Sequence, residues 1–130
     1  MIVTMRKLLF AGIAMVMSLG VFGQAKSKVM VMDIKAEIDP RMLRYVKLAV
    51  EHADEIKADY IIIDMDTYGG VLTDAKEIVD LIMDLKRPVW VFINSDAASA
   101  GALISIACDS IYNTTVVNHP KALVELVNKI

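Results

Sequence analysis

Two short stretches of small and polar residues are the places where this sequence could do chemistry. Gly69-Gly70 follows the apolar run from Tyr60 to Asp64, and Ser99 follows a second apolar run, Val89 to Ile93. A serine in the first turn of a helix, just past a strand, places its hydroxyl at the positive end of the helix dipole, where unpaired backbone amides also point. Such a helix end stabilises a developing negative charge, so Ser99 is a candidate nucleophile.

The glycine pair could complete that site. Gly69 and Gly70 carry no side chains, so backbone amides there could approach a substrate closely, as an oxyanion hole requires. The structural alternatives stay open, because serine is an ordinary N-cap residue and Gly-Gly an ordinary turn. The other ionisable residues of the region fit no triad spacing. We expect Asp96 in a turn and His119 beside a helix start, and His52, in the first helix, on a solvated face.

The elements that must position these residues follow from the apolar pattern. Strands are predicted at residues 29–34, 60–64, 89–93 and 109–112, and helices at residues 40–56, 71–87, 98–107 and 120–129. Asp39-Pro40 marks the first helix start, with Asp as N-cap and Pro at the first helical position. Alternating strands and helices predict right-handed parallel crossovers and an α/β fold. Ligands in such sheets bind at the carboxyl ends of the strands, where both glycine- and serine-bearing turns fall.

The first 25 residues have the features of a signal peptide. Arg6 and Lys7 precede an apolar stretch from Leu8 to Phe22, and Gly23-Gln24-Ala25 offers small residues for cleavage. An uncleaved membrane anchor is the alternative, although the stretch is short for a span of about 20 residues. In either case we expect residues 26–130 to face an extracytoplasmic space, and their length suits one small domain or part of a larger one.

Composition excludes several function classes. The first 25 residues hold two of the 14 Lys and Arg and none of the 16 Asp and Glu, which leaves a formal charge of −4 for the rest. No basic patch remains, so nucleic acid is not an expected partner. Cys108 is the single cysteine, so no internal disulfide forms, and its apolar neighbours predict an inert buried thiol. With two His and one Cys in no ligand spacing, neither a metal nor another cofactor is expected.

Two motifs in the same order resemble a known family. Asp66-Thr67-Tyr68-Gly69-Gly70, followed downstream by Ala98-Ser99-Ala100-Gly101, is similar to the ClpP-class membrane serine proteases of the NfeD family. The resemblance spans roughly Val29 to Asp109. It implies the ClpP/crotonase-like fold, with repeated β-α-β units and a mainly parallel sheet, and an exported endopeptidase with a Ser-Lys dyad.

The resemblance also implies roles for individual residues. Ser99 matches the nucleophile, and Gly70, with Gly69 beside it, matches the glycine turn of the oxyanion hole. The amide of Ala100 would be the second donor. Tyr68 stands where many members have proline. The implied partners are a peptide or protein substrate, a stomatin-like membrane protein and further copies of the same chain.

After Tyr112 the sequence departs from the pattern of the family. There the chain looks shortened, and no residue matches the lysine that deprotonates the serine. Lys121 and Lys129 are the lysines that follow Ser99, and both are expected to be solvated. A serine without an adjacent base is a weak nucleophile. A catalytically inactive domain for binding or assembly is therefore the alternative, and a crotonase-type acyl-CoA enzyme conflicts with a signal peptide.

Overall fold

A computed structural model of the chain describes residues 23, 25–115 and 117–129. The predicted signal peptide falls almost wholly outside these residues and stays a prediction. The strands are β1 (Val29–Ile34), β2 (Tyr60–Thr67), β3 (Val89–Ala97) and β4 (Ser110–Asn113). The helices are α2 (Pro40–Glu55), α3 (Leu72–Asp84), α4 (Ala100–Ile106) and α5 (Pro120–Val127).

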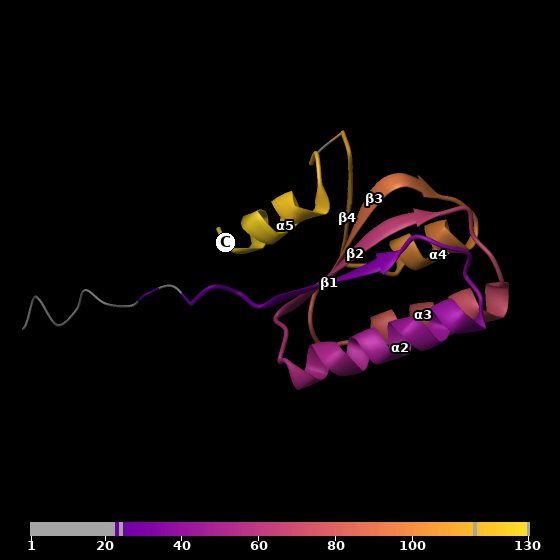
Figure 1. Ribbon diagram of the computed structural model, residues 1–130, viewed down its shortest axis with the longest axis horizontal. Coiled ribbons are helices and arrows are strands. Elements are labelled where there is room, and N and C mark those ends of the chain that lie inside the picture. The colour runs from indigo at the N-terminus through magenta and orange to yellow at the C-terminus, as the bar shows by residue number, and fades with distance from the viewer. Residues whose placement is uncertain (1–22, 24, 116, 130) are drawn as a thin grey trace, which may run out of the picture.

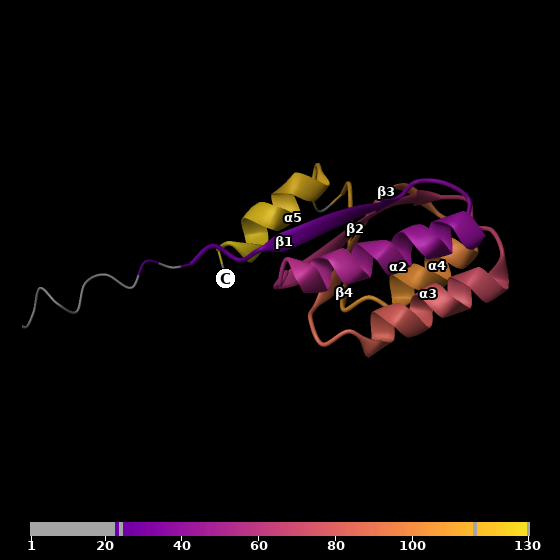
Figure 2. The same ribbon diagram turned by 60° about the horizontal axis from the view of Figure 1, so that its bottom comes forward.

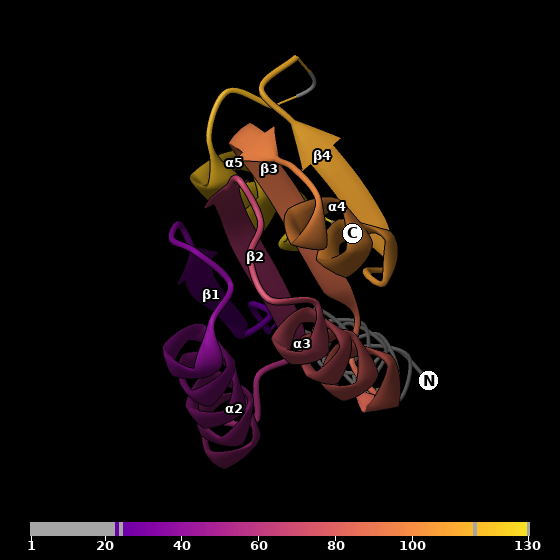
Figure 3. The same ribbon diagram turned by 90° about the vertical axis from the view of Figure 1, so that its right-hand side faces the viewer.

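The four strands form one parallel sheet in the order β1-β2-β3-β4. Each strand is thus the neighbour of the next in sequence, and each connection carries a helix, so the predicted α/β fold of repeated β-α-β units is confirmed. Helices α2, α3 and α4 cover one face of the sheet, and α5 lies on the opposite face (Figures 1 and 3). This arrangement places the strand–helix turns after β1, β2 and β3 at one edge of the sheet.

Two apolar clusters make the core, one on each face of the sheet. Ile61, Ile63 and Met65 of β2 point to the cluster shared with α2, α3 and α4. Ile62 points the other way, with Trp90 and others, against α5. Because both faces of β2 are covered, its sequence is a continuous apolar run rather than an alternating one.

The start of α2 confirms the capping prediction. Asp39 accepts hydrogen bonds from the amides of Arg41 and Met42, both at 2.9 Å, and Pro40 occupies the first helical position. The aspartate thereby satisfies two of the amides that the first helical turn leaves unpaired. The helix then packs its apolar stripe beside α3, and the two run side by side (Figure 2).

The structure corrects three predicted boundaries. β2 and β3 run several residues past their apolar runs, because the pairing continues, through a register shift, to Thr67 opposite Ala97. Asp96 therefore lies within a strand, and the turn predicted for it is wrong. α3 ends at Asp84 rather than at residue 87, because the backbone of Leu85 is already extended, with φ −69° and ψ 139°. Arg87 then lies outside the helix and donates hydrogen bonds to the Ala53 and Ala58 carbonyls, both at 2.8 Å.

Candidate functional site

The structure brings the glycine turn after β2 against Ser99. A Cβ atom placed on Gly69 would lie 2.9 Å from Ser99 Cβ and 3.3 Å from the Ala100 nitrogen. The amide of Ala98 donates to the Thr67 carbonyl at 3.0 Å, which extends the β2–β3 pairing up to this contact. The two motifs that the sequence singles out are therefore direct neighbours in space.

Gly70 is fixed by a second neighbouring segment. The Ile38 amide donates to the Gly69 carbonyl at 2.9 Å, and the Val71 amide donates to the Ile38 carbonyl at 2.7 Å. A Cβ on Gly70 would lie 2.1 Å from that Ile38 carbonyl oxygen. Both glycines have positive φ, 111° at Gly69 and 153° at Gly70. Only glycine fits either position without displacing backbone.

Ser99 has an unusual backbone conformation. Its φ is 50° and its ψ is −112°, and its side chain makes no capping hydrogen bond to α4. The alternative that Ser99 is an ordinary N-cap is therefore wrong, because an ordinary cap has extended backbone and accepts an amide hydrogen. Ser99 is exposed. A non-glycine residue held at such angles is strained, and strain of this kind persists where the surrounding structure imposes it.

Two backbone amides near Ser99 are left without partners. Among the described residues, neither the Gly70 amide nor the Ala100 amide donates a backbone hydrogen bond, whereas the following amides, those of Val71 and Gly101, do. Ala100 begins α4, so its amide is one of those that a helix leaves unpaired. The arrangement offers a hydroxyl and two unpaired amide donors around the Gly69–Ser99 contact.

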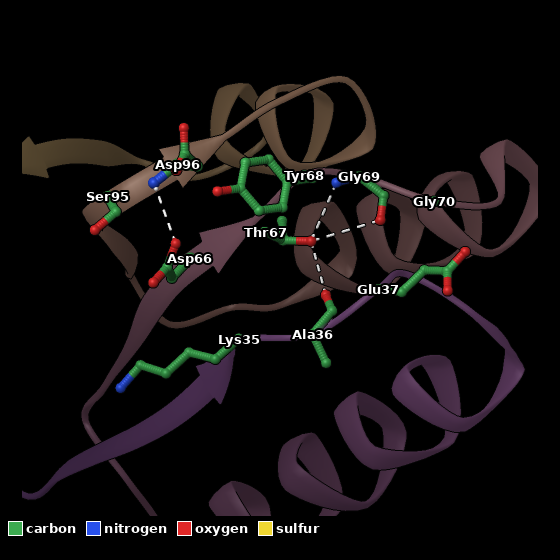
Figure 4. Close-up of a pocket in the computed structure, with 10 residues that line it drawn as sticks. All are labelled: Lys35, Ala36, Glu37, Asp66, Thr67, Tyr68, Gly69, Gly70, Ser95 and Asp96. Carbon is green, nitrogen blue, oxygen red and sulfur yellow. Dashed lines mark hydrogen bonds between the residues drawn. The ribbon is translucent and has the colours of Figure 1, made fainter.

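Beside the glycine turn lies a groove of about 680 Å³ (Figure 4). It opens beyond the carboxyl ends of β1, β2 and β3. The residues that line it are Lys35, Ala36, Glu37, Asp66, Thr67, Tyr68, Gly69, Gly70, Ser95 and Asp96. Ligands of open parallel sheets bind in a crevice at this edge.

The Thr67 side chain links the segment after β1, which lines the groove, to the glycine turn. Its buried hydroxyl donates to the Ala36 carbonyl at 2.7 Å and accepts from the Gly69 amide at 3.2 Å (Figure 4). The single side chain thus ties the segment after β1 to the turn after β2. This hydrogen bonding holds Gly69 against Ser99.

Lys35 is held by carboxylates. Its Nζ lies 2.5 Å from Asp64 Oδ2 and 3.2 Å from Asp33 Oδ1. The hydrogen bond to Asp64 is the largest of the effects that raise the pKa of Lys35 above its ordinary value. Lys35 therefore stays protonated at neutral pH. A protonated amine cannot accept the hydroxyl proton of a serine, so Lys35 is unsuited to the role of general base.

The remaining reactive side chains lie apart from the Gly69–Ser99 contact or are already engaged. Lys121 and Lys129 are exposed, in and just after α5 on the opposite face of the sheet. His119 Nδ1 accepts the Lys121 amide at 3.1 Å as the cap of α5. Burial raises the pKa of the Cys108 thiol to about 12, in agreement with the inert thiol predicted. In the described ranges, no group of His, Cys, Asp and Glu side chains is arranged to hold a metal ion.

Several groove residues were not identified from the sequence. Lys35, Glu37 and Ser95 received no role, and Asp96 was assigned to a turn. The available signal was position, since Lys35 directly follows β1 and Ser95 and Asp96 lie in the last three residues of β3. Polar and charged residues near the carboxyl ends of predicted parallel strands thus indicate where the groove lies.

Residues 28–124 match the family described as NfeD1b, N-terminal domain. The chain belongs to this family. It is also 33% identical over 104 residues to the membrane protein NfeD1b of Bacillus subtilis (strain 168). That match covers 78% of this chain and 24% of the relative, so the NfeD1b-like chain spans about a quarter of the curated relative's length.

Solved structures agree with this assignment. The 1510-N membrane protease specific for a stomatin homolog from Pyrococcus horikoshii superimposes with a TM-score of 0.62 at 32% identity, over 68% of this chain and 46% of that one. A lysine-to-alanine mutant of the 1510-N stomatin-specific protease, in complex with a substrate peptide, gives a TM-score of 0.62 at 30% identity. That match covers 68% of this chain and 42% of the protease chain. An asparagine-to-aspartate mutant of ClpP1 from Listeria monocytogenes gives a TM-score of 0.59 at 22% identity. That match covers 76% of this chain and 68% of the ClpP1 chain, and it supports the shared fold. The domain is thus a ClpP-like NfeD domain.

The relative's name associates the family with membranes. Within the described part of the NfeD1b-like chain, no helix has the length and apolar character that crossing a bilayer needs.

Proposed function

We propose that this domain is a serine endopeptidase domain in which Ser99 is the nucleophile. The observation that carries the proposal is the contact of Ser99 with Gly69, and the amides of the next residues, Gly70 and Ala100, donate no backbone hydrogen bond among the described residues. The similarity to stomatin-specific proteases at 30% and 32% identity supports it.

The proposed reaction is acyl transfer. Ser99 Oγ forms a bond to the carbonyl carbon of a peptide and gives its proton to a base, and the carbonyl oxygen becomes an oxyanion between the Gly70 and Ala100 amides. The C–N bond then breaks, and the amine leaves with the proton from the base. Water then attacks the acyl carbon and gives a proton to the base. The bond from the acyl carbon to Ser99 Oγ breaks, and the base returns that proton to the serine oxygen.

The base is the part of this mechanism that the described residues do not supply beside Ser99. We propose a lysine for it, because a desolvated lysine of lowered pKa can take the serine proton. The chain matches less than half of each 1510-N protease chain. In a longer form, we propose that this lysine follows the matched region, and in the present chain Lys121 is the first residue to test.

Export, membrane association and partners belong to the same proposal. A signal peptide in residues 1–25 would deliver the domain to the periplasmic side of a membrane. The specificity of the P. horikoshii protease for a stomatin homolog makes a stomatin-like protein the proposed partner or substrate. The ClpP-like fold supports self-association of the domain.

A second function has an observation in its favour. Lys121 and Lys129 are exposed and sit with α5 on the sheet face opposite α4. Lysines in that position are solvated and do not lie beside Ser99 to take its proton. A domain of this fold without a base would bind a peptide in the groove and not cleave it.

Labelling with a fluorophosphonate probe decides between the two functions. The full chain is compared with Ser99→Ala and, as matched control, with Ser95→Ala, which removes another exposed serine of the same region. Labelling that is lost in Ser99→Ala and kept in Ser95→Ala supports the peptidase, and its further loss in Lys121→Ala assigns the base. Absence of labelling in a protein with native circular dichroism overturns the peptidase proposal for this chain.

A further inference from the structure

The groove beside the glycine turn carries an excess of carboxylates. Asp66 and Asp96 are the next-to-last residues of β2 and β3, and the Asp96 amide donates to Asp66 Oδ1 at 3.3 Å (Figure 4). Glu37 adds a third carboxylate from the segment after β1. Among the described residues, none of the three forms an ion pair, although six other pairs are formed.

Lys35 also lines the groove, but its positive charge does not neutralise this excess of carboxylates. Lys35 is engaged by Asp64 and Asp33, on the strands β2 and β1. Asp64 is buried, with a side chain only 7% exposed, and its Oδ1 has no hydrogen-bond partner within the described residues. The carboxylates that surround Lys35 thus exceed its single charge even before Asp66 and Asp96 are counted. Among the described residues that line the groove, no free cation is therefore left to neutralise Glu37, Asp66 and Asp96.

We propose that Asp66 and Asp96 make this groove selective for extended peptides that carry a lysine or arginine side chain. The inference rests on the proposed function only in that the peptide enters the groove lined by the glycine turn, which packs against Ser99. The ammonium or guanidinium group is held in the groove by the carboxylates that line it, chiefly those of Asp66 and Asp96. The peptide backbone passes over the Gly69-Gly70 turn, where no side chain obstructs it. Opposite charge in a cleft both raises the local concentration of a cationic ligand and fixes its register.

A metal ion is the competing occupant for paired carboxylates. The described residues hold no grouping of three potential ligands suited to a metal. Several carboxylates along an open groove fit the several donors of an ammonium or guanidinium group.

Peptide binding, measured apart from cleavage, tests the proposal. The probe is a fluorescein-labelled decapeptide of Ala, Val and Ser with one central Lys, beside the same peptide with Gln or Glu at that position. Fluorescence anisotropy is recorded with the full 130-residue chain carrying Ser99→Ala, in a nonionic detergent at low salt. The Lys peptide is expected to bind about tenfold more tightly than the Gln peptide, which is the scale of two partly exposed ion pairs. The Glu peptide is expected to bind most weakly.

Variants assign the preference to particular carboxylates. The double variant Asp66→Asn, Asp96→Asn removes both charges. It keeps a side-chain oxygen at position 66 that can accept the hydrogen bond from the backbone amide of residue 96. We expect it to abolish the difference in affinity between the Lys and Gln peptides. Glu37→Gln is expected to reduce it. Glu51→Gln, an exposed residue in the last turns of α2 and without an ion pair among the described residues, is the control that should leave it unchanged.

Equal affinity for Lys and Gln peptides, or a preference that survives the double variant, overturns the proposal. So does a change in protein stability on addition of Ca²⁺ alone that the double variant abolishes, since this assigns the carboxylates to a metal. Fluorophosphonate labelling of Ser99 is independent of these measurements. A labelled Ser99 with no Lys preference rejects only the specificity, and a Lys preference without labelling rejects only the peptidase.

Discussion

Gly69 and Ser99 are packed so closely that position 69 has no room for a side chain. A methyl group there would lie 2.9 Å from Ser99 Cβ and 3.1 Å from the Ala98 carbonyl oxygen. The contact joins the turn after β2 to the start of α4, and it holds Ser99 at its strained φ of 50°. The positions of the glycine and the serine are therefore mutually dependent.

Substitution of either glycine should destabilise the fold. Gly69→Ala combines a positive φ with a close contact to Ser99, and we expect a loss of about 1–3 kcal/mol in the free energy of unfolding. Gly70→Ala should cost more, because its methyl group would meet backbone atoms of Ile38, which cannot rotate away. Urea denaturation monitored by circular dichroism measures both. Tyr68→Ala, at a side chain 83% exposed, is the control and should change stability by under about 0.5 kcal/mol. A Gly70→Ala protein as stable as the control would contradict this account of the turn.

Lys35 should contribute stability that depends on pH. Lys35→Met leaves the buried Asp64 carboxylate without its cation, and we expect a loss of about 1–3 kcal/mol at neutral pH. Lys47→Met, which breaks an exposed pair with Glu77, should cost no more than about 1 kcal/mol. Chemical denaturation of the two variants and the parent protein gives the comparison.

The pH dependence follows from the direction of the pKa shift. The folded state raises the pKa of Lys35 above 10.5, so it binds this proton more tightly than the unfolded chain does. The stabilisation is complete below about pH 10.5 and falls as the pH rises through the folded pKa. The difference in stability between the parent and Lys35→Met should therefore shrink above pH 10.5. A difference that stays constant to higher pH would show that the Lys35–Asp64 pair is not its source.

The sequence predicted the sheet and its helices because their signals are local. Asp39-Pro40 specifies a helix start by its own chemistry, and the apolar run from Tyr60 to Asp64 identifies a strand that is buried on both faces. The crossover rule then places the two motif-bearing turns at the same edge. From these steps alone the proximity of Gly69 and Ser99 could be expected.

The rest of the site depends on contacts between distant segments. The positive φ of Ser99 is imposed by Gly69 and α4, and serine itself has no preference for it. The extension of β3 through Asp96 depends on pairing with Thr67, since the side chains there are polar. The Lys35–Asp64 pair joins neighbouring strands whose register the sequence does not state. Periodicity could therefore not place the acidic groove.

Cys108 should react slowly with thiol reagents in the folded protein. Burial raises its pKa to about 12, and its Sγ donates to the Ile104 carbonyl at 3.4 Å, so the thiolate is scarce at pH 8. Its reaction with Ellman's reagent, followed by absorbance, should be at least about a hundredfold slower than in urea-unfolded protein, where the thiol has its ordinary pKa near 8.5. Comparable rates in the two states would mean that the thiol is accessible and ionised.

The packing of α5 can be tested through Leu123, which is fully buried against the sheet. Leu123 shares a cluster with Trp90 and Phe92. Leu123→Ala should lower the free energy of unfolding by about 2–4 kcal/mol, since it removes buried methyl groups and leaves a cavity. Trp90 is the single tryptophan, so its fluorescence reports the change directly. Leu126→Ala, on the same helix at a side chain 41% exposed, should cost under about 1 kcal/mol and leave the Trp90 emission unchanged. If both variants behave alike, α5 does not hold its place on this face, and the position of Lys121 relative to Ser99 must be judged anew.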